Sequence, residues 1–294
     1  MSTHSPSLRQ VLSETWRVIA AHPRHFLALS ALFLLPVSFS AVLYYLHSIS
    51  TISTPYTQPH LLISILYILP TLFFTLCAIP SITTTTFAAF HRKPISFRLS
   101  LQSIVLSFFP LLATKFITQI IFGSILFVFG VLVLVAYIGL TLLGLEIEYD
   151  NNSPYFLVFV VMATVVLVFV FVYLQVEWCL SSAVVVLESK WGFEPLRRSS
   201  RLVKGKRWVA LSMTVLFASI GSVLTVLYSN LVRSKGGVCQ GWVVFVQMVV
   251  YVVVSTVLSL YGLVANTVLF AYCKELTAMI DEETSGKYVA LPIV

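Results

Sequence analysis

The stretch FLALSALFLLPVSFSAVLYYL, residues 26–46, runs for 21 residues without an Asp, Glu, Lys or Arg. As a helix with a rise of 1.5 Å per residue it is about 31 Å long, which matches the roughly 30 Å hydrocarbon core of a bilayer. Arg9, Arg17 and Arg24 precede it, as basic residues precede the apolar part of a signal peptide. The run is longer than the apolar part of a usual signal peptide, contains Pro36 and lacks a clear small-residue cleavage site. It therefore predicts a retained first transmembrane helix.

The composition extends this prediction to the whole chain. Of its 294 residues, 59% are hydrophobic and only 10% are charged, and the mean hydropathy is +0.97. Such a chain has too little polar surface to cover a soluble globule. Counting apolar stretches long enough to cross gives six spans, at about 26–46, 61–90, 116–143, 155–187, 208–232 and 242–273. We expect one transmembrane domain over 1–294, with an amphipathic cytosolic N-terminus at 1–25 and a cytosolic tail at 274–294.

The basic residues give the orientation. Fifteen of the eighteen Lys and Arg residues fall in four clusters that six crossings place on one side, leaving two outside and Lys115 within the bilayer region. Because short cytosolic segments are enriched in Lys and Arg, the clusters and both termini are expected in the cytosol. The clusters are Arg9, Arg17, Arg24; Arg92, Lys93, Arg98; Lys190, Arg197, Arg198, Arg201, Lys204, Lys206, Arg207; and Lys274, Lys287.

One region leaves the number of crossings open by composition alone. The apolar stretch 99–143 could hold one span or two. Residues 99–109, before Pro110, are too short to cross, whereas 116–143 is an ample uncharged span. A further crossing would also move the large basic cluster after Glu188 to the outside, against the positive-inside rule. We therefore assign one crossing here.

The predicted fold is an all-α polytopic membrane protein whose six helices form three helical hairpins, with an amphipathic interfacial helix before each odd-numbered span. The first amphipathic stretch is the clearest, because Leu8, Val11, Leu12, Thr15, Trp16 and Ile19 recur at helical spacing. Ser7 with Gln10 resembles a capping box, and Pro23 is expected to end the helix. A second such helix is predicted over 192–204, with Phe193, Leu196, Ser200 and Val203 on its apolar face.

The residues around this second helix resemble those of a known family. They are Trp178, Leu187-Glu188, Gly192, Leu196-Arg197-Arg198-Ser199 and Leu202-Val203-Lys204-Gly205-Lys206, together with Tyr272-Cys273-Lys274 and Tyr288-Val289-Ala290-Leu291 near the end. This pattern resembles a plant family of largely uncharacterised six-helix membrane proteins. It is more distantly similar to the membrane domain of bacterial glycerophosphodiester phosphodiesterases. The resemblance covers nearly the whole chain and implies six helices and a membrane location, but no activity, because the catalytic barrel of those enzymes has no counterpart here.

Two sets of charged residues are candidate functional positions. Lys115 and Glu177 lie in or near spans, where ionisable residues are often functional, and we predict that they pair or share neighbours such as Gln119 and Gln175. This charge pair could serve transport or could simply join two helices. The second set is expected to contact anionic lipid headgroups, or else merely to anchor the topology. It comprises Arg197, Arg198, Arg201, Lys204, Lys206 and Arg207.

An enzyme reading has no support in the residues. No His pairs with a carboxylate inside a span, and no Asp lies within one, so we expect no catalytic, metal or cofactor-binding residues. Cys77 and Cys179 are expected to pack in the core. Cys273 is a possible acylation position, Asn151 begins a glycosylation sequence, and Ser200 follows a basic pair as in some kinase sites. Whether any of these three is modified is left open.

Two functions remain. The favoured one is a membrane organiser or adaptor that contacts anionic lipids on the cytosolic side, or other membrane proteins, in the plasma membrane or an endomembrane, and binds no nucleic acid. The alternative is a small-solute transporter or channel. In a transporter the polar residues of the spans would converge on one cavity, whereas in an organiser they would be scattered helix-packing contacts. The oligomeric state and any specific partner are not determined by the sequence.

Overall fold

The computed structural model describes residues 7–52, 60–93, 97–142, 154–234 and 241–289, and within these ranges every regular element is a helix. Six helical runs are long and apolar enough to cross a membrane: Pro23–His47, Ser64–Phe90, Ser100–Gly139, Leu157–Glu188, Arg207–Asn230 and Phe245–Met279. The predicted all-α fold with six spans is therefore confirmed. The helices, in order, are α1 Leu8–Ala21, α2 Pro23–Leu29, the π-helical turn η1 Ser30–Leu34, α3 Leu35–Ile52, α4 His60–Phe90, α5 Phe97–Leu142, α6 Pro154–Glu177, α7 Ser181–Glu188, α8 Glu194–Val203, α9 Arg207–Ser234 and α10 Gly241–Val289.

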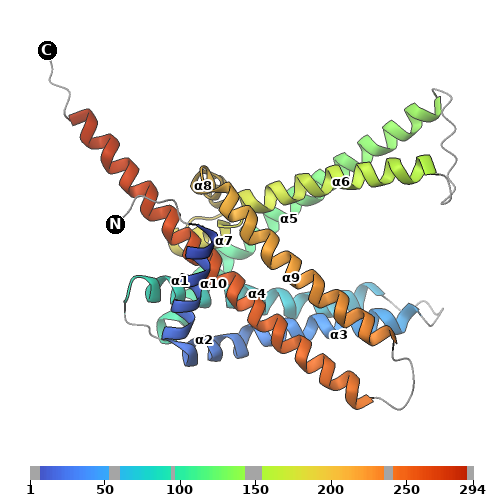
Figure 1. The fold of residues 1–294 in the computed structure, drawn as a ribbon, viewed down its shortest axis with the longest axis horizontal. Coiled ribbons are helices and arrows are strands. Elements are labelled where there is room, and N and C mark those ends of the chain that lie inside the picture. Colours follow the sequence, from blue (N-terminus) through green and yellow to red (C-terminus); the bar gives the residue numbers. More distant parts are fainter. Residues whose placement is uncertain (1–6, 53–59, 94–96, 143–153, 235–240, 290–294) are drawn as a thin grey trace.

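Helices that follow one another run back and forth between two ends of the molecule (Figure 1). Helices α1 and α8 and the C-terminal half of α10 lie at one end. The last residues of α3 and α9 and the first residues of α6 point to the other end. The outer halves of α5 and α6 diverge from those of α3, α4, α9 and α10, so the transmembrane part is split into two arms. An even number of crossings follows from this arrangement, as the charge pattern predicts.

The first span is a compound helix. Helix α2 begins at Pro23, where the missing N–H costs no hydrogen bond, and passes through η1 into α3. The π turn lies directly before Pro36, which has no N–H to donate and whose ring would clash with the carbonyl four residues back. A local widening of the helix at Ser30–Leu34 relieves such a clash, which gives a physical reason for the irregular turn.

Two spans differ in outline from the expectation. The basic stretch around Phe97 is continuous with the third span, because α5 passes through Pro110 as one helix of 46 residues. It is therefore not a separate helix of the kind that precedes the first and fifth spans. The fourth span is broken: α6 ends at Glu177, the chain turns, and α7 begins at Ser181.

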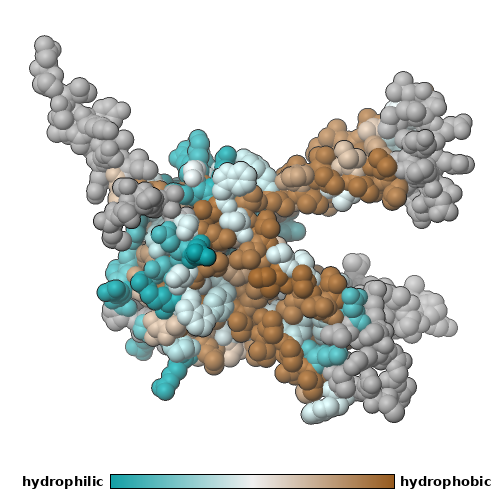
Figure 2. Space-filling model, viewed as in Figure 1, coloured by the Kyte–Doolittle hydropathy of each residue, from teal (hydrophilic) through white to brown (hydrophobic). Residues whose placement is uncertain are grey.

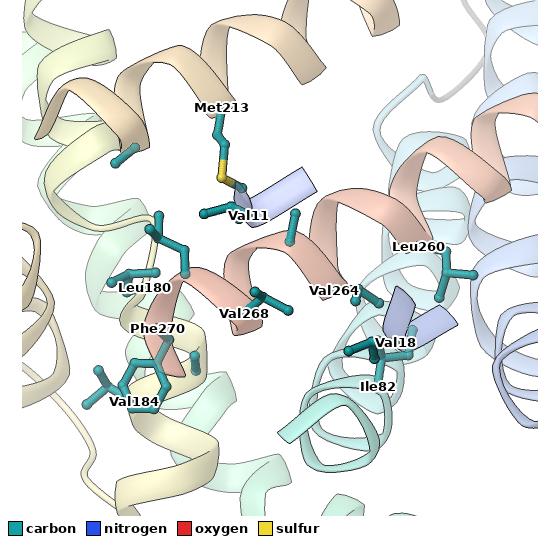
Figure 3. Packing of buried hydrophobic residues seen from close by; sticks show 14 of the residues in the cluster. Val11, Val18, Ile82, Leu180, Val184, Met213, Leu260, Val264, Val268 and Phe270 are labelled. Carbon is teal, nitrogen blue, oxygen red and sulfur yellow. The ribbon is translucent and has the colours of Figure 1, made fainter. Parts of the chain in front are cut away.

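The hydrophobic core lies at the end of the molecule that carries α1 and α8. Helix α10 is its centre, because Val264, Val268 and Phe270 are fully buried. Side chains of α1, α4, α7, α9 and the turn before α7 pack around it, as Figure 3 shows for Val11, Val18, Ile82, Leu180, Val184 and Met213. Buried Val11, Thr15 and Val18 of α1 are thus covered by protein, and exposed Trp16 stacks on Tyr261 at 6.3 Å.

The outer halves of α5 and α6 have the opposite character. Their most apolar windows contain no buried residue, and Phe127 and Phe169 are each more than 70% exposed. Figure 2 shows an almost continuous hydrophobic surface on this arm, while hydrophilic residues gather at the end with α1 and α8. Exposed apolar patches of this extent are the surface that a bilayer covers.

Hydroxyl groups join the helices across the bundle. The Thr85 and Ser100 hydroxyls are 2.8 Å apart and connect α4 with α5, and those of Ser40 and Thr71 are 2.6 Å apart and connect α3 with α4. Thr256 donates to the Ser38 hydroxyl at 3.1 Å. Small polar residues commonly connect helices in this way where water is absent.

Candidate functional site

The break between α6 and α7 places one carboxylate inside the protein. Glu177 is the last residue of α6 and is only 4% exposed. Its Oε1 lies 2.7 Å from Nε of Arg207, the first residue of α9. Its Oε2 accepts a short hydrogen bond from the Ser200 hydroxyl of α8. The Ser199 hydroxyl donates to the Glu177 backbone carbonyl at 2.7 Å.

These contacts fix three helices together. We call Glu177, Ser199, Ser200 and Arg207 the Glu177 cluster. The guanidinium of Arg207 also lies 5.9 Å from the ring centre of Tyr173, one turn before Glu177 on α6. A buried carboxylate needs a positive partner and hydrogen-bond donors, and this cluster supplies both from α8 and α9. It holds α8 against the end of the fourth and fifth spans.

The predicted direct pair between Lys115 and Glu177 is not formed. Glu177 binds Arg207, and Lys115 makes no ion pair with any residue in the described ranges. Of the neighbours that the two residues were predicted to share, Gln175 lines one cavity with Lys115, whereas Glu177 and Gln119 do not belong to that lining. From the sequence we predicted that Arg207 contacts headgroups, because it is thirty residues away from Glu177. The turn at 178–180 and the packing of α8 bring the two side chains together.

The six predicted headgroup contacts divide into three sets. Arg207 pairs with Glu177, and Arg198 lies 3.4 Å from a carboxylate oxygen of Glu188. Lys206 is half-buried. Arg197, Arg201 and Lys204 are exposed on α8 and have no carboxylate partner among the residues that the structure describes. We call these three the basic face of α8.

The opposite side of α8 is buried. Pro195, Leu196, Ser199, Leu202 and Val203 lie against the protein. Phe193 was expected on the apolar face of this helix but is 66% exposed. Ser200, which was also expected on that face, does lie on the side of the protein, where it donates a hydrogen bond to Glu177. The helix is followed by Gly205 at φ +96°, a backbone conformation that favours glycine and lets the chain turn into α9.

A second feature lies deeper in the spans. A cavity of about 510 Å³ is lined by residues from all six spans, and its volume is in the range of small-molecule sites. We call it the central cavity. Much of its lining is polar, although it lies among apolar helices: Thr75, Lys115, Thr118, Gln175, Ser181, Ser182, Thr214, Ser259 and Asn266.

The positions suggested for covalent modification have different outcomes. Cys273 is 3% exposed and packs in the core, so an acyl chain has no access to its thiol in this structure. Cys77 is buried in the same core and Cys179 packs against it, as predicted. Asn151 lies outside the described residues. Within the described ranges, no three His, Cys, Asp or Glu side chains are grouped so that they could hold a metal ion.

Comparison with known proteins gives the family but no activity. The model of a family described as a domain of unknown function, DUF8558, matches residues 43–284. The chain belongs to this family. The match extends from within α3 into α10 and therefore includes the Glu177 cluster, the basic face and the lining of the central cavity except Leu34 and Val37. No curated protein and no solved structure matches the chain. The resemblance to a plant family and to the phosphodiesterase membrane domain stays a prediction.

Proposed function

We propose that this multi-pass membrane protein is a membrane organiser that binds anionic lipid headgroups through the basic face of α8. One observation carries the proposal: Arg197 and Arg201 of α8 and Lys204, which directly follows the helix, are exposed and have no acidic partner among the described residues. Anionic lipids attract each such cation by about 1 kcal/mol near a membrane surface. Three of them on one rigid helix and its C-cap form a surface that a negatively charged leaflet complements.

The Glu177 cluster supports this role by holding the helix in place. Ser199 and Ser200 tie α8 to Glu177, so the orientation of the basic face is set before any lipid arrives. A preorganised surface loses less conformational entropy on binding than a mobile segment does. By the positive-inside rule the face is directed to the cytosolic leaflet, where anionic lipids are concentrated.

Native mass spectrometry of the purified protein, released from micelles containing equal amounts of phosphatidylserine and phosphatidylcholine, tests the proposal. The wild type is expected to retain phosphatidylserine preferentially. The triple variant R197Q/R201Q/K204Q is expected to lose most of that preference. The matched control R9Q/R24Q/K93Q removes three exposed cations elsewhere and should keep it. If both triple variants lose the preference for phosphatidylserine equally, net charge alone explains that preference and the proposal is refuted.

A transporter is the second candidate, and the central cavity is the observation in its favour. Thr75, Ser259 and Asn266 converge there, next to the broken fourth span, as polar residues do in transporters. Other polar residues of the spans instead join helices, such as Ser38 with Thr256, which is typical of packing. Solute and ion flux into liposomes that contain the purified protein separates the two functions.

A further inference from the structure

Lys115 is the charged residue around which two cavities meet. Among the described residues that line the central cavity, it is the one charged side chain, and none of them is a carboxylate. A second cavity of about 500 Å³ lies between α3, α4 and α5, and Lys115 and Thr75 line both. We call this second cavity the lateral groove. The two cavities therefore adjoin at Lys115 and Thr75.

The polar groups of the central cavity fall into two classes. The hydroxyls of Thr75, Thr118 and Thr214 each donate to a carbonyl of their own helix, at 2.7–2.9 Å. The remaining side chains make no hydrogen bond or ion pair with any residue in the described part of the chain. They are Lys115, Gln175, Ser181, Ser182, Ser259 and Asn266. Five uncharged polar side chains and one ammonium group thus point to a common space without protein partners.

The depth of the cavity makes an unpartnered charge costly. Thr214 lies seven residues into α9 from Arg207, and Asn266 lies eight residues before Lys274, which corresponds to about 10–12 Å along each helix. Lys115 therefore stands beside groups that are well inside the apolar spans. Ionisable residues at such depths ordinarily pair or mark a ligand site. Because no described residue supplies an anion to Lys115, an anionic ligand would complete its pairing.

The lateral groove indicates what else the ligand carries. Its lining includes Tyr44, Tyr67, Ile68, Leu72 and Leu76. Its Ser and Thr hydroxyls are already occupied, since Ser40 and Thr71 bond to each other, Thr71 also donates to the Tyr67 carbonyl at 2.8 Å, and Thr75 donates to the Thr71 carbonyl at 2.7 Å. The groove is therefore apolar in effect and suits a hydrocarbon chain rather than a hydrated solute.

We propose that the two cavities together bind an anionic amphiphile, with its carboxylate or phosphate head at Lys115 in the central cavity and its alkyl chain in the lateral groove. The amide groups of Gln175 and Asn266 and the Ser hydroxyls donate to the head. Hydrogen bonds between charged partners are the strongest available to a side chain, so Lys115 dominates the recognition of the head. The proposal concerns binding alone and depends neither on lipid contacts of α8 nor on transport.

Binding of a radiolabelled long-chain fatty acid and of a lysophosphatidic acid to the purified protein in nanodiscs tests the proposal. Saturable binding of at least one is expected, and the two arms distinguish a carboxylate from a phosphate head. An alkylamine and a lysophosphatidylcholine of the same chain length should compete at least 10-fold more weakly. Inorganic phosphate and acetate lack the chain and should not compete at equal concentrations.

Variants of Lys115 test whether its positive charge is needed for binding. Lys115→Gln should weaken binding about 10- to 100-fold, the range for loss of a hydrogen bond between charged groups. Lys115→Arg keeps the charge and should retain most of the affinity. Lys93→Gln removes an exposed lysine outside both cavities and should bind as the wild type does. Elution on gel filtration checks that each variant is folded.

A photoactivatable fatty acid locates the chain in the unaltered protein, so this readout stands even if Lys115→Gln fails to fold. Its label is expected on peptides of α3 and α4 that line the lateral groove. Labelling confined to the outer halves of α5 and α6 would overturn the proposal, as would an unchanged affinity of a folded Lys115→Gln protein. Absence of saturable binding by both anionic amphiphiles would overturn it as well.

Discussion

At the scale of single residues, Glu177 shows how burial changes the meaning of a charge. In the sequence it is a carboxylate near the end of a span, and Lys115 is the nearest candidate partner by depth. In the structure its oxygens are used by Arg207 and Ser200, and Lys115 is left for the central cavity. The two charges that the sequence grouped together therefore have separate tasks, one structural and one in the proposed ligand site.

Removing either member of the Glu177–Arg207 pair is expected to destabilise the protein unequally. Arg207→Gln leaves a buried carboxylate without its cation and should cost about 2–4 kcal/mol. Glu177→Gln leaves an arginine whose side chain is 48% exposed and can be hydrated, so the cost should be about 1–2 kcal/mol. Thermal unfolding in detergent, followed by tryptophan fluorescence, measures both.

The surface pair of Lys190 and Glu194 provides the control. Its atoms are 2.5 Å apart, but both side chains are more than a third exposed, so Lys190→Gln should change stability by less than about 1 kcal/mol. If Arg207→Gln melts no earlier than Lys190→Gln, the Glu177 cluster does not hold α8 in the way described above.

At the scale of elements, the helices that differ most from the sequence prediction lie next to prolines and breaks. The interfacial helix expected before the third span is not separate from it, because α5 continues through Pro110. Proline inside a transmembrane helix is tolerated because neighbouring groups can satisfy the freed carbonyl. No proline lies at the break after Glu177, so the sequence gives no local signal for it. It is stabilised by the contacts of Glu177 with α8 and α9, which no local sequence pattern reveals.

The turn between α8 and α9 yields a second prediction. Gly205 has φ +96° with open space around its position, so Gly205→Ala should cost about 1–2 kcal/mol through backbone strain alone. Gly130 lies in α5 with no neighbour in reach of an added methyl group and no positive φ. Gly130→Ala should be neutral or slightly stabilising. The melting temperatures of the two variants, compared with that of the wild type, test whether this turn needs glycine; similar values for both would contradict it.

At the scale of the whole molecule, six crossings put α1 and the C-terminal half of α10 at one end (Figure 1). The basic clusters at that end predict a cytosolic location. The hydrophilic surface gathers there as well (Figure 2). This arrangement underlies the proposed contact of the basic face with the cytosolic leaflet.

Tag accessibility tests the topology directly. Epitope tags placed at the N-terminus and at the C-terminus should both be inaccessible to antibody in intact cells. Both should become accessible once the plasma membrane alone is permeabilised, whether the protein resides in that membrane or in an endomembrane. A tag inserted at residue 150 should show the opposite accessibility. Terminal tags on opposite faces would contradict an even number of crossings and the orientation of the basic face.

The sequence by itself determined the all-α class, the six spans and the capping of α1, where the Gln10 N–H donates to the Ser7 hydroxyl and the Ser7 N–H to the Gln10 side chain. These features depend on local apolar length and on residues three or four positions apart. Tertiary structure alone decided the partner of Glu177, the burial of Cys273 and the meeting of polar residues from the second to the sixth span around Lys115. The physical reason is distance along the chain: contacts between separate helices depend on how those helices pack, and apolar helices of similar composition do not encode their packing in any short pattern.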